Sequence, residues 1–292
     1  MAHWAEAHQA LLGSTRPFGD IALLRHFPSL AWNGRHPWHA AMHMEQVLVH
    51  MRVPWRLFDS VSRDTLAQVQ TLALPDMESL SDDDLALLRD WVRGGGRLFF
   101  TGRTGTHDEF RRRRPRPAIL SWFPEFDRPR SAEDWFSWCK EAFSESEEPG
   151  DRLKEEPWVR PFGEGRLGYW PQIVGGNACC LVNSWLKPEE WVPPPEAPAM
   201  EKFLRGLHGP FRFEVDGPAS LLTNTAIHKE TGEILLHLIQ VDTDAAPPDL
   251  TIRGVEGQAR VLSPDAAPPV LEHRDGHLRL SGLNRYAVVV FS

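Results

Sequence analysis

The sequence predicts a protein of two parts, an open α/β layer with a mostly parallel sheet followed by a small antiparallel β-sandwich domain. In the first half of the chain, short apolar strands alternate with segments of helix length, which is typical of parallel β-α-β units. From residue 211 onward, short alternating strands follow one another with turn sequences between them, a pattern typical of a sandwich or small barrel. The length of 292 residues allows two domains that each bury a core.

The elements of the first half have recognisable start and stop signals. The helix over 82–93 follows Ser81 as its N-cap and carries aspartates in its first turn, where the helix dipole favours negative charge. It ends at the glycines of 94–96, a strong C-terminal signal. A helix over 38–52 is predicted from apolar residues at helical spacing. The strands are predicted over residues 20–24, 55–58, 69–74 and 97–101.

Residues 103–160 interrupt this alternation and form a predicted insertion. The insertion contains a cluster of arginines, several prolines and a helical segment over 132–143. Insertions at the carboxyl end of a parallel strand often build binding surfaces or subunit contacts. A further strand is expected over 165–171, and a short helix over 199–207 follows a proline-rich linker at 193–198.

The last part of the chain is predicted to consist of short strands. Glycine-containing turns at 229–232 and 274–276 mark two hairpins. The strands are expected over residues 211–215, 221–228, 234–241, 250–253, 258–262, 270–274, 277–280 and 286–291. The expected division is a helix and lead-in at 1–19, the α/β domain at 20–192, a linker with a short helix at 193–210, and the β domain at 211–292.

Composition limits the function classes. The formal net charge of −8 argues against a nucleic-acid partner, because such domains are usually basic. Cys139, Cys179 and Cys180 are too few for a disulfide framework, so we expect buried thiols in a reducing compartment. The N-terminus has no apolar signal core, and no window approaches the roughly 18 apolar residues that span a bilayer. We therefore expect a cytoplasmic protein without a membrane partner.

Two further compositional features each allow two interpretations. The run Arg111 to Arg114 with Arg116 is typical of a solvated face or of salt-bridge partners, with anion binding as the alternative. The 12 tryptophans are typical of core or interface anchors, with a sugar-binding surface as the alternative.

The sequence indicates no metal or other cofactor. His39 and His43 have the i, i+4 spacing of zinc ligands, but they lack the glutamate of the H-E-x-x-H motif. We expect these histidines to lie on a helix surface.

The turn after the strand 97–101 reads Thr101-Gly102-Arg103-Thr104. In glutamine amidotransferase-like folds, a nucleophilic cysteine occupies this turn. Here it has neither a cysteine nor the serine of a G-x-S-x-G elbow, and a threonine without a neighbouring base is a poor nucleophile. Amidotransferase chemistry is therefore not expected.

Several motifs in a fixed order resemble family 42 β-galactosidases over roughly residues 20–292. The first group resembles the trimerisation domain of that family, a glutamine amidotransferase-like fold without its nucleophile. It consists of Leu72-Ala73-Leu74-Pro75, Leu80-Ser81-Asp82, Trp91-Val92, Gly94-Gly95-Gly96, Thr101-Gly102 and Asp108-Glu109. The second group resembles the strand after it and the C-terminal β domain: residues 163–169, 232–238, Ser263-Pro264-Asp265 and the strand 286–291.

The resemblance implies a role in assembly, and a role in forming one wall of the sugar-binding site of a partner. The catalytic glutamates of these enzymes lie on a (β/α)8 barrel of about 250 residues, for which this chain has no room, so no catalytic residue is carried over. We expect an accessory or oligomerisation protein of carbohydrate metabolism that self-associates as a homotrimer and takes a carbohydrate ligand. A further interpretation is that the chain is the C-terminal piece of a longer enzyme.

The alternative is a small glycoside hydrolase, which needs two carboxyl groups across a sugar. Because neighbouring strand ends converge on one crevice in an open parallel sheet, carboxylates after the strands 69–74 and 97–101 are candidates. The structural alternative is that these carboxylates cap loops or pair with the arginines. The candidate catalytic residues are Asp76, Glu78, His107, Asp108 and Glu109, and the candidate ligand or interface residues are Arg103, Arg113, Trp122, Trp135 and Trp170.

Overall fold

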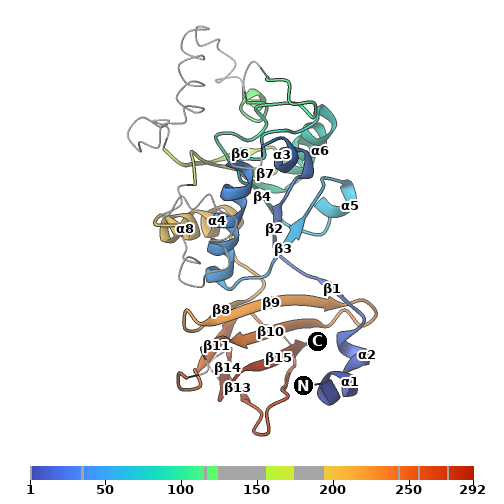
Figure 1. The fold of residues 1–292 in the computed structure, drawn as a ribbon, viewed down its shortest axis with the longest axis vertical. Coiled ribbons are helices and arrows are strands. Elements are labelled where there is room, and N and C mark those ends of the chain that lie inside the picture. The colour runs from blue at the N-terminus through green and yellow to red at the C-terminus, as the bar shows by residue number, and fades with distance from the viewer. Residues whose placement is uncertain are drawn as a thin grey trace. The chain divides into compact units, whose positions relative to one another are not determined.

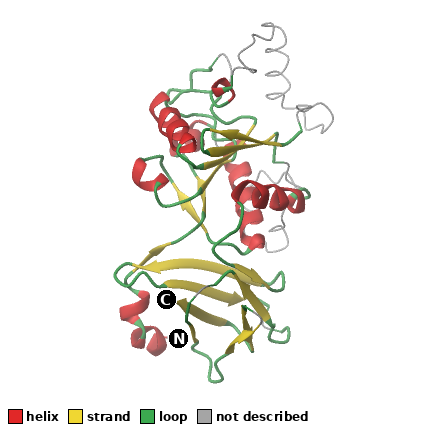
Figure 2. Cartoon of the chain, turned by 180° about the vertical axis from the view of Figure 1, so that it is seen from behind, coloured by secondary structure: helices red, strands yellow, loops and turns green. Residues whose placement is uncertain are grey.

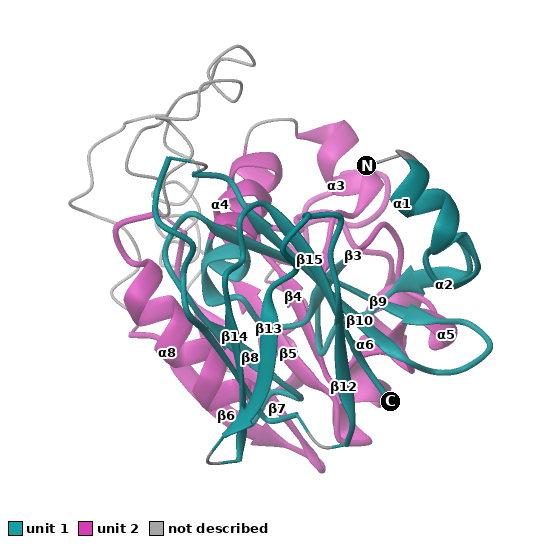
Figure 3. Cartoon of the chain, turned by 90° about the horizontal axis from the view of Figure 1, so that it is seen from below, with its two compact units in different colours: residues 1–22, 47–56, 209–292 teal, residues 23–46, 57–208 magenta. Residues whose placement is uncertain are grey.

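The computed structural model describes residues 2–33, 36–114, 117–123, 156–173, 194–242, 244–255, 257–274 and 276–292. The chain divides into two compact units (Figure 3). Unit 1 comprises residues 1–22, 47–56 and 209–292, and unit 2 comprises residues 23–46 and 57–208. The architecture is mixed α/β, with two antiparallel sheets and one mixed sheet (Figure 1). The domain boundaries expected from the sequence stay a prediction.

Unit 1 is built on two antiparallel sheets. The five-stranded sheet has the order β1 (Thr15–Pro17), β9 (Leu221–His228), β10 (Ile234–Gln240), β15 (Tyr286–Phe291) and β12 (Ala259–Leu262). The four-stranded sheet has the order β13 (Val270–Arg274), β14 (His277–Ser281), β11 (Leu250–Arg253) and β8 (Glu214–Asp216). Among the described residues after 209 there are strands and loops but no helix (Figure 2).

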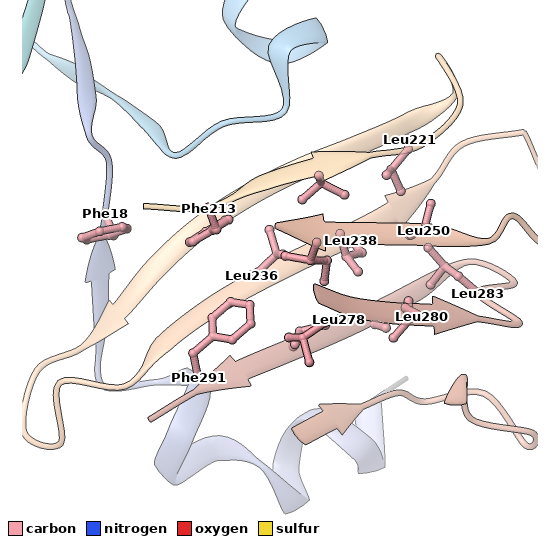
Figure 4. Packing of buried hydrophobic residues seen from close by; sticks show 14 residues of the cluster. Phe18, Phe213, Leu221, Leu236, Leu238, Leu250, Leu278, Leu280, Leu283 and Phe291 are labelled. Atoms are coloured by element: carbon pink, nitrogen blue, oxygen red, sulfur yellow. The ribbon is translucent and has the colours of Figure 1, made fainter. Parts of the chain in front are cut away.

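One hydrophobic cluster joins the two sheets of unit 1 (Figure 4). Leu236 and Leu238 come from β10, whereas Leu278 and Leu280 come from β14, and all four side chains are buried. Phe18, which follows β1, belongs to the same cluster. The alternation of buried and exposed residues along β14 fits a strand with one face on this core. The short helices α1 (Ala2–Ala7) and α2 (Gln9–Leu12) supply Trp4 and Leu11 to a second cluster on the same five-stranded sheet.

Unit 2 holds most of a six-stranded sheet. Its order is β3 (Trp55–Phe58), β2 (Ile21–Leu24), β4 (Thr71–Leu74), β5 (Arg97–Thr101), β7 (Gly165–Trp170) and β6 (Trp158–Phe162). The strands β4, β5 and β7 pair in parallel, and β6 pairs with β7 in the antiparallel sense. The remaining elements are α3 (Phe27–Trp32), α4 (His36–Met51), α5 (Arg63–Leu66), α6 (Asp82–Arg93), η1 (Leu120–Trp122) and α8 (Ala197–His208).

Local sequence explains where α6 begins and ends. The Ser81 side chain accepts a hydrogen bond from the Asp84 backbone, and the Asp84 side chain accepts one from the Ser81 backbone, which completes a capping box. Leu85, Leu88 and Val92 form its buried face. The helix predicted over 82–93 and the strand predicted over 97–101 are confirmed at those bounds.

The sequence prediction missed some elements and misplaced others. Strands β1 and β6 and the helix α3 were not predicted, and the strand expected over 211–215 begins later, at Glu214. The helix expected over 132–143 lies outside the described residues, as do Cys139, Cys179, Cys180 and Arg116. Within the described part of the chain, no helix has both the length and the apolar character to cross a membrane.

Candidate functional site

Two loops of unit 2 run side by side at the carboxyl ends of the parallel strands β4 and β5. The first loop carries Asp76 and Glu78, and the second carries residues 102–114. The backbone of His107 donates to the Glu78 carbonyl (2.9 Å), and the backbone of Leu80 donates to the His107 carbonyl (3.2 Å). Because β4 and β5 are adjacent, their loops place Asp76, Glu78 and His107 in one region.

Asp76 lies at the turn that follows β4 and is bound to the turn that follows β5. Its carboxylate accepts a 2.5 Å hydrogen bond from the Thr101 hydroxyl, which in turn accepts one from the Asp76 backbone at 2.7 Å. The backbone of Arg103 also donates to this carboxylate. Burial raises the pKa of Asp76 to about 6, against the lowering effects of the Arg103 guanidinium and the Thr101 hydroxyl. Asp76 also has a left-handed backbone, with φ of 50°.

Glu78 is fully buried and surrounded by donors. The Asn33 amide nitrogen lies 3.0 Å from Oε1 and 2.9 Å from Oε2. A terminal nitrogen of Arg103 lies 3.4 Å from Oε1, and a terminal nitrogen of Arg111 lies 3.5 Å from Oε2. A buried carboxylate requires such partners, because an unpaired buried charge is strongly disfavoured.

His107 is buried beside these groups. Its Nδ1 lies 3.0 Å from the Thr106 hydroxyl. Burial lowers the pKa of His107, and the charges of Arg111 and Arg113 lower it further, whereas Glu78 acts in the opposite direction. The ring is therefore mainly neutral at pH 7.

The Asp108 carboxylate is bound within its own loop. Asp108 Oδ1 accepts hydrogen bonds from the backbones of Phe110 (3.0 Å) and Arg112 (2.8 Å), and Oδ2 accepts one from Arg112 Nε (2.6 Å). Although its limited burial opposes ionisation, these bonds from Arg112 and Phe110 lower the pKa of Asp108. The Glu109 carbonyl accepts a 3.1 Å hydrogen bond from the Trp32 indole. Asp108 thus organises its own loop, and the Glu109 backbone connects this loop to α3.

The candidate arginines and tryptophans take different positions. The Arg113 backbone forms a bridge with His107, so Arg113 lies in the same loop. Trp122 stacks on Phe162, with ring centroids 5.6 Å apart. The Trp170 indole donates to the Gln172 carbonyl (3.0 Å), and its ring packs edge-on against Phe203. Trp135 lies outside the described residues.

Sequence reasoning missed Asn33, Thr101 and Arg111 as members of this cluster. Asn33 follows α3, a helix that was not predicted, and Arg111 was read only as part of a charged run. No set of three or more metal-ligating side chains is found in the described ranges. His43 Nδ1 lies 3.0 Å from the Gln46 side-chain oxygen, one turn further along α4.

The fold is similar to parts of known glycoside hydrolases. An α-L-fucosidase isoenzyme 2 from Paenibacillus thiaminolyticus matches with a TM-score of 0.55 and 14% identity, over 99% of this chain and 50% of the fucosidase. A family 42 β-galactosidase from G. stearothermophilus matches with a TM-score of 0.54 and 13% identity, over 99% of this chain and 43% of that enzyme. A β-galactosidase from Bacillus circulans sp. alkalophilus matches with a TM-score of 0.56 and 11% identity, over 99% of this chain and 44% of the galactosidase.

These likenesses establish the fold and its extent. The chain spans about half the length of the solved structures it matches, while they cover nearly all of it. The resemblance to family 42 β-galactosidases expected from the sequence is thus confirmed as a structural relation to a part of such enzymes. No family model and no curated protein sequence matches the chain.

Proposed function

We propose that the chain is a non-catalytic accessory module of carbohydrate metabolism that acts in the cytoplasm through self-association. In this proposal unit 2 has a glutamine amidotransferase-like fold that lacks the nucleophile of the amidotransferase reaction. The observation that carries the proposal is the turn after β5. There the Thr101 hydroxyl and the Arg103 backbone both donate to Asp76. These two hydrogen-bond donors of the turn are therefore used by a carboxylate of the chain itself.

The state of the other carboxylates supports the same proposal. Glycoside hydrolysis needs one carboxyl group to donate a proton and another to act as nucleophile or base at the sugar. Here Glu78 is fully buried against Asn33 and two guanidinium groups, and both oxygens of Asp108 accept hydrogen bonds within its loop. These contacts favour a structural use of the carboxylates.

The test of the proposal is the mass of the protein in solution. Size-exclusion chromatography with light scattering at micromolar concentration is expected to give a multiple of the chain mass, and we propose a trimer. Trp135 is proposed as an interface residue, so Trp135→Ser is expected to shift the protein toward the monomer. Trp158→Phe is the matched control, because the Trp158 ring stacks on Tyr169 within unit 2. A monomer for the unaltered chain contradicts the proposal.

A second candidate function, a small glycoside hydrolase, is favoured by one observation. Asp76 has a pKa of about 6, which is the range of a carboxyl group that donates a proton near neutral pH. A panel of nitrophenyl glycosides should be assayed with the variants Asp76→Asn, Glu78→Gln, Asp108→Asn and Glu109→Gln. Turnover that one of these substitutions abolishes would establish the hydrolase and contradict the accessory role. If there is no turnover, or if none of the four substitutions changes the turnover, these carboxylates are excluded as a catalytic site.

A further inference from the structure

Trp32 differs from the other tryptophans in the described ranges. Among them it is the only one whose side chain is exposed, at 53%. Its ring has no aromatic or cation–π contact with the described residues. Trp122, Trp158 and Trp170, by contrast, each pack against another ring of unit 2. Those three tryptophans are therefore used in packing, whereas the Trp32 ring is available to a ligand.

We propose that Trp32, Glu109 and Phe110 bind a neutral sugar of one or two rings. One pyranose ring lies on the indole, and its hydroxyl groups donate to the Glu109 carboxylate. The inference rests on the proposed role in carbohydrate metabolism, for which it names a ligand and a site. The site lies where the end of α3 meets the loop after β5, and it does not use the buried carboxylates of Asp76 and Glu78.

One hydrogen bond holds the indole against the loop. Trp32 Nε1 donates to the Glu109 carbonyl at 3.1 Å, which fixes the edge of the ring beside residue 109. Covalent geometry then keeps the Glu109 carboxylate within about 10 Å of the indole nitrogen. The aromatic ring and the carboxylate thus lie within the span of one or two sugar rings.

The end of α3 is itself held in place. The Asn33 backbone donates to the Ser29 carbonyl at 3.1 Å, and the Asn33 side-chain nitrogen lies 2.9 Å from Glu78 Oε2. Trp32, the residue before Asn33, is therefore fixed through its backbone and through its indole. A ring that is already ordered loses little conformational entropy when a ligand binds.

The Glu109 carboxylate is an unused acceptor. In the part of the chain that the structure describes, it has no hydrogen-bond or ion-pair partner, and the side chain is partly exposed. The Arg112 guanidinium, in the same loop, is already paired with Asp108 at 2.6 Å. Sugar hydroxyl groups donate to a carboxylate in charge-assisted hydrogen bonds, which are the strong ones. A sugar acid would instead place a second negative charge beside Glu109.

Phe110 extends the apolar surface next to Glu109. Its side chain is 65% exposed. Its backbone donates to Asp108 Oδ1 at 3.0 Å, and the Arg112 guanidinium lies 5.2 Å from the centroid of its ring. Phe110 is therefore held at the surface of the loop by two neighbouring residues.

The size of this surface fits a sugar better than a protein. An aromatic side chain has about 150–250 Å² to bury, so Trp32 and Phe110 together offer roughly 200–300 Å². A stable protein interface buries about 800 Å² on each partner. A pyranose presents an apolar face of C–H groups beside its hydroxyl groups, which matches an aromatic ring beside a carboxylate.

The experiment is saturation-transfer NMR of the full chain with methyl β-glucoside, methyl β-galactoside, methyl β-glucuronide and sorbitol. We expect saturable binding of a neutral glycoside, with the strongest transfer to the C–H protons of its ring. The glucuronide adds a negative charge, and sorbitol has hydroxyl groups without a ring, so both should bind about tenfold more weakly or less. No saturable binding of either neutral glycoside, or equal binding of the glucuronide or sorbitol, overturns the proposal.

Variants assign the binding to these residues. Trp32→Leu keeps an apolar side chain without the flat ring, and Glu109→Gln removes the charge while keeping the shape. Each is expected to weaken binding by about tenfold or more. The matched controls are Phe27→Ala, an exposed aromatic residue at the start of α3, and Glu272→Gln, on β13 of unit 1. Both controls are expected to leave binding unchanged.

Circular dichroism verifies the fold of each variant, and Glu109→Gln decides if Trp32→Leu fails to fold. Equal weakening by the controls would show general attraction and overturn the site. A change of mass in solution on Trp32→Leu, without sugar binding by the unaltered chain, would show a protein contact instead and also overturn it. A monomer that binds a neutral glycoside keeps this proposal and contradicts self-association, and an oligomer that binds none does the reverse, so the two failures are distinguishable.

Discussion

At the residue scale, the Asp76 carboxyl group couples the stability of unit 2 to pH. Burial raises its pKa from 3.8 to about 6, so the folded chain keeps this proton over a range in which the unfolded chain has lost it. The free energy of unfolding therefore falls as pH rises from about 4 to about 6. At 1.36 kcal/mol per pKa unit, this shift corresponds to about 3 kcal/mol.

The variant Asp76→Asn removes this proton equilibrium and leaves an acceptor for the Thr101 hydroxyl. We expect the variant to gain stability relative to the unaltered chain as pH rises from about 4 to about 7. Urea unfolding of both proteins at several pH values measures this difference. A difference that does not change with pH would show that Asp76 titrates normally.

His208 is expected to act in the opposite direction. It ends α8, and its Nδ1 lies 2.7 Å from the Thr71 hydroxyl at the start of β4. Burial, followed by the charge of Arg97, lowers the pKa of His208 to about 4. The unfolded chain takes up a proton near pH 6.5 and the folded chain does not, so the free energy of unfolding falls as pH drops from about 6.5 to 4.

The variant His208→Gln removes this titration while keeping a polar partner for Thr71. We expect it to lose less stability than the unaltered chain between pH 7 and pH 5, because glutamine takes up no proton on unfolding. Chemical denaturation at these two pH values, followed by circular dichroism, provides the measurement. Equal losses in both proteins would contradict the lowered pKa.

The sequence predicts part of the candidate cluster at this scale. Asp76, Glu78 and His107 follow two strands that were predicted to be neighbours, and the structure brings their loops together. Asn33 could not be predicted, because it reaches Glu78 across 45 positions of sequence from a helix without a clear signal. The orientation of Arg111 depends on a left-handed backbone that no residue type in the arginine run indicates.

At the element scale, two glycines of unit 2 differ in the space available for a β-carbon. A β-carbon at Gly165, where β7 begins, would overlap with the backbone oxygens of Val92 and Gly96 at the end of α6. Because backbone atoms cannot move aside easily, Gly165→Ala is expected to destabilise the protein by about 1–3 kcal/mol or more. Gly206 lies within α8, and no described atom is found within 4 Å of the place of its β-carbon.

Gly206→Ala is therefore the matched control and is expected to stabilise the protein by about 0.5–1 kcal/mol, through helix propensity. Thermal unfolding of the two variants compares them directly. Similar effects of the two substitutions would contradict the close approach of β7 to α6.

One helix with strong local signals was predicted at its bounds, whereas α5, which has a capping box, and two strands with weak local signals were not predicted. The helix 82–93 carries its own cap and stop, so its bounds follow from sequence alone. Strand β6 contains Pro161, which argues against a strand in the interior of a sheet, but β6 is the last strand of its sheet, where proline is tolerated. Strand β1 has only three residues and pairs with β9, more than 200 positions away.

At the scale of the whole molecule, unit 1 is discontinuous in sequence. Strand β1 covers the outer edge of β9, and Phe18 joins the core between the two sheets. The Thr225 hydroxyl donates to the Phe18 carbonyl at 2.6 Å, and the Phe18 backbone donates to the Thr225 carbonyl at 3.1 Å. The N-terminal residues thus complete both a sheet edge and a core of the last part of the chain.

A fragment of residues 211–292 tests whether the predicted β domain is complete by itself. We expect the fragment to unfold without a sharp transition, because it lacks Phe18 and leaves the hydrogen-bonding edge of β9 uncovered. A peptide of residues 1–22 added in trans is expected to restore a cooperative transition. The same peptide with Phe18→Ala should restore less, because a buried phenylalanine contributes about 3–5 kcal/mol relative to alanine. A fragment that unfolds cooperatively, and that the peptide leaves unchanged, would show that residues 211–292 hold a sufficient core and that β1 only lies against it.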